Sequence, residues 1–134
     1  MSYLWIALGG ALGSVARFWL SGLVANHTGR IGQTFPMGTL LVNISGSLAI
    51  GFFAALGEPG GRRFLGSTGR QFLMVGVCGG YTTFSSFSLQ TLELMRDGDW
   101  FKAGLNSVAS FVLCLVAVWA GYVLGLGINS GKGN

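Results

Sequence analysis

Hydroxyl-bearing and aromatic side chains alternate over a short stretch of this sequence, residues 81–88, which reads YTTFSSFS. Phe84 and Phe87 are three residues apart and would share one face of a helix, with Ser85 and Ser88 forming an adjacent hydroxyl pair. An aromatic pair alone usually packs against other apolar groups. Its alternation with hydroxyl groups is unusual for packing alone, which makes the stretch a candidate binding site.

The chemistry of this mixture suits a small, hard and strongly hydrated anion. Hydroxyl groups, together with an amide such as that of Asn43, donate hydrogen bonds that replace lost water. The edge of a phenyl ring is electropositive, so an anion can approach it in the ring plane. No fixed charge in the stretch would hold the ion too tightly, as conduction requires.

Two glycines precede this stretch, at Gly79 and Gly80. Paired glycines followed by β-branched threonines have low helix propensity, so a helix break is expected between Gly79 and Thr83. Within a membrane, a broken helix is tolerated where its exposed backbone groups line a cavity or bind an ion. Alternatively, these glycines only permit close helix packing.

Two further polar residues lie within apolar runs. Asn43 forms a small, polar stripe with Gly46 and Ser47 at helical spacing, which is either a packing face or a pore-lining amide. Arg17 lies two-thirds of the way along the first run, and an arginine there is costly unless it reaches water. It is either an interfacial anchor or a positive charge at the mouth of an anion pathway.

Four apolar runs, residues 3–25, 38–56, 72–95 and 103–126, are each about 19 to 24 residues long. Helices of this length cross a ~30 Å hydrocarbon layer. The connections between them are short and polar or glycine-rich. We therefore expect an all-α membrane protein in which residues 1–134 form one domain of four transmembrane helices, the third of them broken.

Composition supports a lipid environment and argues against several other classes. Charged residues make up 9 % of the 134 residues, against roughly 25 % in soluble domains. The basic residues are scattered rather than gathered on a nucleic-acid-binding face, so no nucleic-acid partner is expected. The sequence has no nucleophile–base pair, metal-ligand cluster or phosphate-binding loop, which argues against an enzyme. Cys78 and Cys114 lie in apolar runs and are expected to be small buried hydrophobes.

The basic residues divide almost evenly between the two predicted membrane faces, so they impose almost no orientation. The face with both termini holds Arg62, Arg63, Arg70 and Lys132, and the opposite face holds Arg30, Arg96 and Lys102, with Arg17 leaning towards it. Such a chain could insert either way up, which permits an antiparallel dimer.

The sequence resembles the Fluc (CrcB-type) fluoride channels over its whole length. The resemblance rests on GGALG at residues 9–13 followed by Arg17, on GTLLVN at residues 38–43, and on GGYTTFSSFS at residues 79–88, the most specific of the three. It implies a passive fluoride-selective channel that exports cytoplasmic fluoride across the plasma membrane, the inner membrane of a bacterium. It also implies a dual-topology, antiparallel homodimer with two pores.

The resemblance also implies roles for individual residues. By motif position, Phe84 and Phe87 are similar to the family's pore phenylalanines and Asn43 to its pore asparagine. Ser85, Ser86 and Ser88 resemble its hydroxyl track, and Arg17 its vestibule arginine. A structural sodium ion at the dimer centre would be held by the backbone carbonyls of Gly79 and Thr82, because hard carbonyl oxygens are exposed at a broken helix.

The sequence departs from the family pattern in two places. Gln90, a neutral residue, stands where many relatives carry a glutamate. The fourth run offers Ser107 and Ser110 early and Trp119 later, without an obvious match to the family's polar pore residues.

Two functions other than a channel are also compatible with a small protein of four membrane spans. A small multidrug-type, proton-coupled antiporter needs a titratable carboxylate within the bilayer, and the acids nearest a span, Glu93, Asp97 and Asp99, lie at the end of the third run or just beyond it. A non-conducting assembly subunit would associate through its two GxxxG faces, residues 9–13 and 121–125. Anion flux in liposomes separates these functions from a channel.

Overall fold

A computed structural model describes residues 2–59 and 65–130, and all the regular structure within these residues is helical. The elements are α1 (Ser2–Thr34), α2 (Met37–Leu56), α3 (Ser67–Arg70), η1 (Gln71–Cys78), α4 (Gly79–Tyr81), α5 (Phe84–Arg96) and α6 (Trp100–Asn129).

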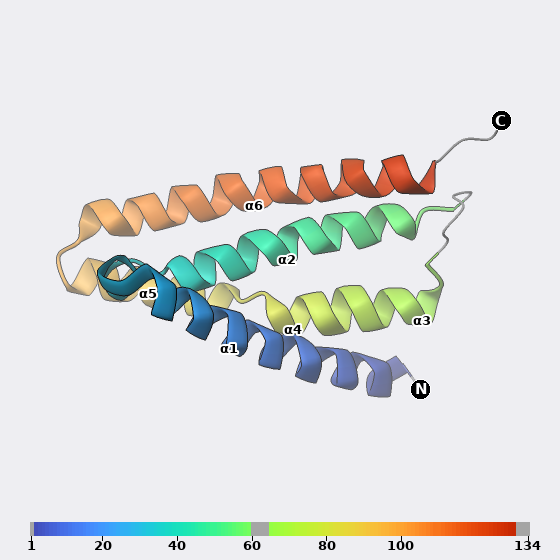
Figure 1. The fold of residues 1–134 in the computed structure, drawn as a ribbon, viewed down its shortest axis with the longest axis horizontal. Coiled ribbons are helices and arrows are strands. Elements are labelled where there is room, and N and C mark those ends of the chain that lie inside the picture. Colours follow the sequence, from blue (N-terminus) through green and yellow to red (C-terminus); the bar gives the residue numbers. More distant parts are fainter. Residues whose placement is uncertain (1, 60–64, 131–134) are drawn as a thin grey trace.

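Within the described residues, four helical segments are long and apolar enough to cross a membrane. They are Ser2–Gly32, Met37–Leu56, Ser67–Arg96 and Trp100–Asn129. The predicted all-helical class with four candidate spans is therefore confirmed. The start of α1 and the end of α6 lie at the same end of the molecule, as an even number of crossings requires (Figure 1).

The first helix is longer than the first apolar run. The sequence predicts a connection over residues 26–37, but α1 continues to Thr34 after a kink at Gly29, whose φ is 51°. The polar side chains beside the kink hydrogen-bond to the preceding turn, from His27 Nδ1 to Leu23 O at 2.9 Å and from Thr28 Oγ1 to Val24 O at 2.7 Å. Because these side chains use helical carbonyls as partners, their polarity does not end the helix.

Helices α2 and α6 run side by side in the same direction along the molecule (Figure 1). Their backbones approach so closely that a Cβ atom added to Gly121 would overlap the carbonyl oxygen of Leu48, and one added to Gly51 would overlap that of Val118. Small residues allow this approach, and the approach supplies the van der Waals contact that holds helices together where lipid removes the hydrophobic driving force.

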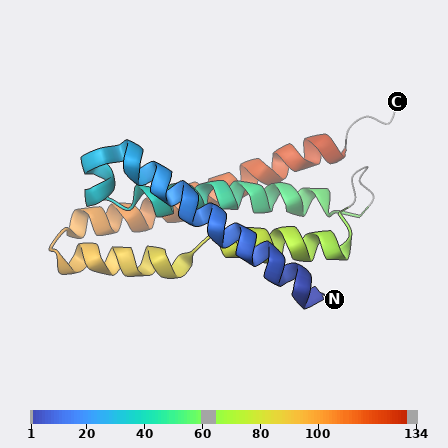
Figure 2. The same ribbon diagram turned by 60° about the horizontal axis from the view of Figure 1, so that its bottom comes forward.

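The second glycine-rich contact joins α1 to the third helical segment, which α1 crosses diagonally (Figure 2). Gly9 lies against Gly76, and a Cβ atom added to Gly13 would overlap the carbonyl oxygen of Val77. Both GxxxG faces are therefore occupied by contacts within one chain, because Gly125 also lies against α2. An assembly subunit would need those faces free, and the structure removes that basis for the hypothesis.

The third helical segment changes character along its length. It begins as α3, passes through the π-helical turns of η1 and returns to α-helix in α4. Thr82 and Thr83 then have extended backbone, with ψ values of 155° and 110°, before α5 begins at Phe84. Gly79 and Gly80 are helical, so the interruption comprises only the two threonines.

The surface of the chain is apolar along most of its length. Large side chains such as Phe18, Phe101 and Trp119 are exposed, whereas many of the buried residues are small. Exposed hydrophobic surface on this scale suits a lipid solvent. Of the basic residues that the sequence divides between two faces, Arg62, Arg63 and Lys132 lie outside the described residues.

Candidate functional site

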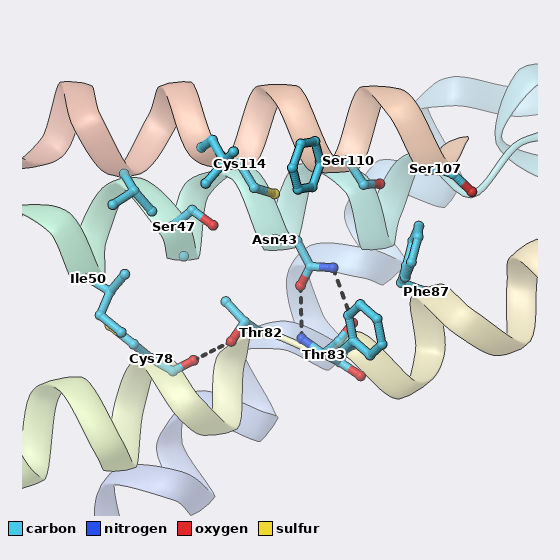
Figure 3. Close-up of a pocket in the computed structure, with 15 residues that line it drawn as sticks. Asn43, Ser47, Ile50, Cys78, Thr82, Thr83, Phe87, Ser107, Ser110 and Cys114 are labelled. Carbon is cyan, nitrogen blue, oxygen red and sulfur yellow. Dashed lines mark hydrogen bonds between the residues drawn. The ribbon is translucent and has the colours of Figure 1, made fainter. Parts of the chain in front are cut away.

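A cavity of about 530 Å³ opens beside the interruption of the third helical segment. Residues from α2, from the segment Cys78–Phe87 and from α6 line it (Figure 3). The lining comprises Asn43, Gly46, Ser47, Ile50, Cys78, Thr82, Thr83, Phe84, Phe87, Ser107, Ser110, Phe111, Cys114, Leu115 and Val118. The two predicted pore phenylalanines and the predicted pore asparagine thus meet at one cavity, although they lie far apart in the sequence.

Asn43 holds the interruption through two hydrogen bonds to the backbone of one residue. Its Nδ2 donates to the carbonyl oxygen of Thr83 at 3.1 Å, and its Oδ1 accepts from the Thr83 N–H at 2.8 Å (Figure 3). A side-chain amide has a donor and an acceptor side by side, so it can pair with both the N–H and the C=O of a residue that is outside a helix. Asn43 therefore lines the cavity and also acts as a clamp, because it pairs the two backbone groups of Thr83 that lack helical partners.

Thr83 also caps the helix that follows the interruption. Its side chain is buried, and its Oγ1 accepts from the Ser86 N–H at 3.2 Å, which satisfies one of the unpaired donors at the start of α5. The same oxygen lies 3.2 Å from Ser85 Oγ and donates to Ser86 Oγ at 3.0 Å. The first turn of α5 is thus built around the Thr83 hydroxyl.

The two phenylalanines form a contacting pair at the start of α5. The ring centroids of Phe84 and Phe87 are 5.4 Å apart and the ring planes are inclined at 45°. Phe84 is 79 % exposed in the single chain, whereas Phe87 is partly buried. Both rings reach the cavity, so the sequence spacing of three does bring them together on one face.

The remaining predicted site side chains lie outside this cavity. Ser88 Oγ donates to the carbonyl oxygen of Phe84 at 2.9 Å, and Ser85 and Ser86 associate with the Thr83 hydroxyl. Arg17 is partly buried on α1 and does not line the cavity either. In the single chain, the three serines therefore lie next to the cavity-lining phenylalanines in the sequence, and Arg17 is on a helix that does not line the cavity.

Helix α6 lines the cavity with six side chains, which the apolar sequence of the fourth run does not suggest. Ser110 and Phe111 follow Ser107 by three and four residues, and Cys114 follows them by four and three, so these side chains share a face. Ser110 Oγ is buried without a hydrogen-bond partner in the part of the chain that the structure describes. A buried hydroxyl that faces a cavity with no partner is available to a bound ion or water.

Asn106, also on α6, is a residue that sequence reasoning missed. It is 1 % exposed, and its Nδ2 donates to Thr91 Oγ1 on α5 at 2.9 Å. The signal that would have found it is an amide inside a membrane-spanning run, since such a group must have a partner in lipid.

The interruption deprives several carbonyl oxygens of their helical donors, those of Gly79 and Thr82 among them. In a continuous helix, Gly79 O would accept from the Thr83 N–H, which instead donates to Asn43 Oδ1. Likewise Thr82 O would accept from the Ser86 N–H, which instead donates to Thr83 Oγ1. Gly79 is exposed on the outer surface of the segment. The two carbonyl groups that the resemblance assigns to a cation are therefore among those that the break releases.

The acidic residues lie away from this cavity. A separate cavity of about 210 Å³ is lined by Gln90 and Glu93 of α5, by Asp97 directly after it, and by the end of α1. Gln90 Oε1 is buried there without a partner within the described residues. Tyr122 donates a hydrogen bond to Glu58, and Asp99 pairs with Lys102 at 2.9 Å.

Taken together, the four apolar helical segments and the uncharged cavity between them define a small multi-pass membrane protein. Residues 4–122 match the family model described as CrcB-like protein, Camphor Resistance (CrcB). The chain belongs to this family.

Curated relatives extend the match to nearly the whole chain. The chain is 66 % identical over 132 residues to the fluoride-specific ion channel FluC of Opitutus terrae, covering 98 % of both chains. It is 60 % identical over 131 residues to the protein of the same name from Rhodospirillum rubrum, covering 98 % of this chain and 99 % of the relative. For that of Methylocella silvestris the identity is 56 % over 133 residues, with 99 % of both chains covered.

Proposed function

We propose that this protein is a fluoride-selective channel that conducts fluoride passively across a membrane and catalyses no reaction. The observation that carries the proposal is the meeting of Asn43, Phe84 and Phe87 at one uncharged cavity beside the interruption. The names of the curated relatives of the same family, fluoride-specific ion channels, support fluoride as the ion.

The cavity suits an anion because its polar side chains include hydrogen-bond donors and none is a carboxylate. Ser110 Oγ has no partner among the described residues and can donate to an ion. The rings of Phe84 and Phe87 can present their electropositive edges. In addition, α5 begins at Phe84, so the positive end of its helix dipole lies beside the cavity.

A proton-coupled antiporter is not favoured. The four acidic residues of the chain all lie outside the main cavity. Proton coupling by such an antiporter requires a titratable carboxylate within the bilayer, and no carboxylate lines this cavity.

We propose that the channel is an antiparallel homodimer with two pores. Phe84 is largely exposed in the single chain, and Ser85 and Ser88 are exposed beside it. An inverted second copy would cover this surface and make these hydroxyl groups part of a closed pathway, with Arg17 at its vestibule. Labelling a terminal tag from each side of intact cells tests the arrangement, since equal labelling is expected and tags confined to one side would reject it.

A structural sodium ion fits the backbone carbonyls of Gly79 and Thr82. Both carbonyls lack the donors that a continuous helix would supply, and carbonyl oxygens are ligands that hard cations prefer. A dimer would bring four such oxygens together where one chain has two. The ion would fix the two interrupted segments without being transported, so fluoride efflux that followed an imposed sodium gradient would contradict this role.

Each chain would form one domain of four transmembrane helices, with the interruption placed within the third. The proposal also includes the pore, vestibule and sodium-binding roles of the individual residues and the location of the channel in a bacterial inner membrane.

Fluoride and chloride efflux from proteoliposomes tests the function directly. Wild-type protein should release fluoride and retain chloride. Phe84→Ile and Phe87→Ile should each abolish fluoride efflux while leaving the dimer intact by gel filtration, because isoleucine fills space without offering a ring edge. Wild-type protein without fluoride efflux would refute the channel, whereas normal efflux in both variants would refute only the aromatic site.

A further inference from the structure

Asn106 is among the most deeply buried side chains of the molecule, with 1 % of its surface exposed. A side-chain amide inside an apolar helix is unfavourable unless it is hydrogen-bonded. It lies on α6 directly before Ser107, which lines the main cavity. An amide that is buried beside the cavity needs a hydrogen-bond partner, and that partner identifies what the amide holds in place.

The partner is Thr91, which links Asn106 to the backbone of Phe87. Asn106 Nδ2 donates to Thr91 Oγ1 at 2.9 Å, and Thr91 Oγ1 donates to the carbonyl oxygen of Phe87 at 2.8 Å. Thr91 is 7 % exposed. Its hydroxyl thus accepts from α6 and donates within α5, so the two helices are joined by a relay that ends at the cavity-lining phenylalanine.

The relay acts at the turn of α5 that carries Phe87. Thr91 follows Phe87 by four residues and lies on the same helix face. The carbonyl of Phe87 belongs to the backbone that sets the direction of the ring. A shift of α5 relative to α6 would therefore move the ring with respect to Ser107 and Ser110 on the opposite wall of the cavity.

We propose that Asn106 and Thr91 are positioning residues that fix the ring of Phe87 relative to α6 and thereby determine fluoride selectivity. The inference rests on the proposed channel function. Neither residue lines the cavity, so both act through Phe87. Ring-edge contacts are sensitive to small displacements, and a misplacement of about 1 Å at a binding site can lower a rate roughly a hundredfold.

Two near-isosteric substitutions test the relay in the full-length protein reconstituted in liposomes. Asn106→Leu removes the donor on α6, and Thr91→Val removes the hydroxyl while keeping the β-branched shape. Each should lower fluoride efflux about tenfold or more and lower the ratio of fluoride to chloride efflux. Thr91→Ser keeps the hydroxyl and should retain the wild-type ratio. The double variant should be no worse than the more affected single variant, because the residues form one unit.

Asn129→Leu is the matched control. Asn129 is also a buried amide on α6, and its Nδ2 donates to Ala55 O at 3.0 Å, near the opposite end of the helix. Its substitution should lower thermal stability much as Asn106→Leu does, but the efflux per folded dimer and the fluoride-to-chloride ratio should stay at wild-type values.

The results separate this inference from the function on which it rests. Wild-type conduction with an unchanged fluoride-to-chloride ratio in both Asn106→Leu and Thr91→Val would overturn the positioning role, even if both variants were less stable. Should Asn106→Leu fail to fold, the comparison of Thr91→Val with Thr91→Ser decides the positioning role. Wild-type protein without fluoride efflux would overturn the channel function and this inference together.

Discussion

The α2–α6 pair and the interrupted third segment are held by different kinds of contact. Between α2 and α6, glycines bring one backbone against the other, as at Gly121 and Leu48. Around Thr82 and Thr83, side-chain amide and hydroxyl groups replace the missing helical hydrogen bonds, with Asn43 as the central partner. Close van der Waals contact predominates between the two regular helices, with one hydrogen bond from Asn129 to Ala55 O near their ends. An irregular backbone, in contrast, must be paired group by group.

This difference predicts where the chain tolerates change. Adding any side chain at a close backbone contact forces the two helices apart and disrupts the fold. Removing a donor or acceptor at the interruption leaves a backbone group unpaired, which alters the cavity first. Substitutions at Gly121, Asn43 and Ser110 test this contrast, and their expected effects on stability decrease in that order.

Gly121→Ala should have the largest effect, because its Cβ atom would overlap the backbone of Leu48. Neither backbone can move without separating α2 from α6, so the loss should reach or exceed the ~3 kcal/mol typical of severe overpacking. Thermal denaturation in detergent measures it. Gly127→Ala on the same helix has no described atom within 4 Å of the added methyl and should stay within about 0.5 kcal/mol of wild type. Equal stability of the two variants would contradict the backbone contact.

Asn43→Asp should lower stability less and abolish fluoride efflux. The carboxylate can still accept from the Thr83 N–H but cannot donate to Thr83 O, and an unpaired buried acceptor costs about 1–3 kcal/mol. Its charge would also repel the anion.

Asn43→Leu separates these two causes, because it removes the clamp without adding charge. Both variants should lose fluoride efflux from liposomes. Normal efflux in Asn43→Leu would mean that only the charge matters and that the clamp is dispensable for conduction.

Ser110→Ala should have the smallest effect on stability, within about 0.5 kcal/mol, because its Oγ has no hydrogen-bond partner to lose among residues 2–59 and 65–130. Fluoride efflux should nevertheless fall severalfold, since the cavity loses a free donor. Ser45→Ala is the control. Its hydroxyl oxygen lies 2.8 Å from Leu41 O and 2.7 Å from the Tyr81 hydroxyl oxygen, and Ser45 does not line the cavity, so efflux should not change. A Ser110→Ala variant with wild-type efflux would exclude this hydroxyl from the pathway.

The expectation of a break in the third helical segment came from a local signal. Poor helix formers and alternating hydroxyl and aromatic groups all lie within residues 79–88. The prediction included the glycines in the break, and they are helical instead. Gly80 packs against Gly10 of α1, so a tertiary contact keeps this pair in helical conformation despite its weak propensity.

The roles of α6 and of the end of α1 could not be inferred from the sequence. Ser107 and Ser110 stand in an ordinary apolar run, and only the close packing of α6 on α2 turns that face towards the interruption. Similarly, residues 26–34 look like a loop, yet the side chains of His27 and Thr28 hydrogen-bond to the helix that they extend.

The sequence by itself determined the solvent, the number of helical spans and the residue types at the site, because apolar run length and local composition control these properties. The tertiary structure alone decided which polar groups are paired and which remain available. Asn43 is used by the backbone of Thr83, Asn106 by Thr91, and Ser110 Oγ by no group in the described part of the chain. Hydrogen-bond partners come from other helices, and the distance between helices is set by packing that no local pattern records.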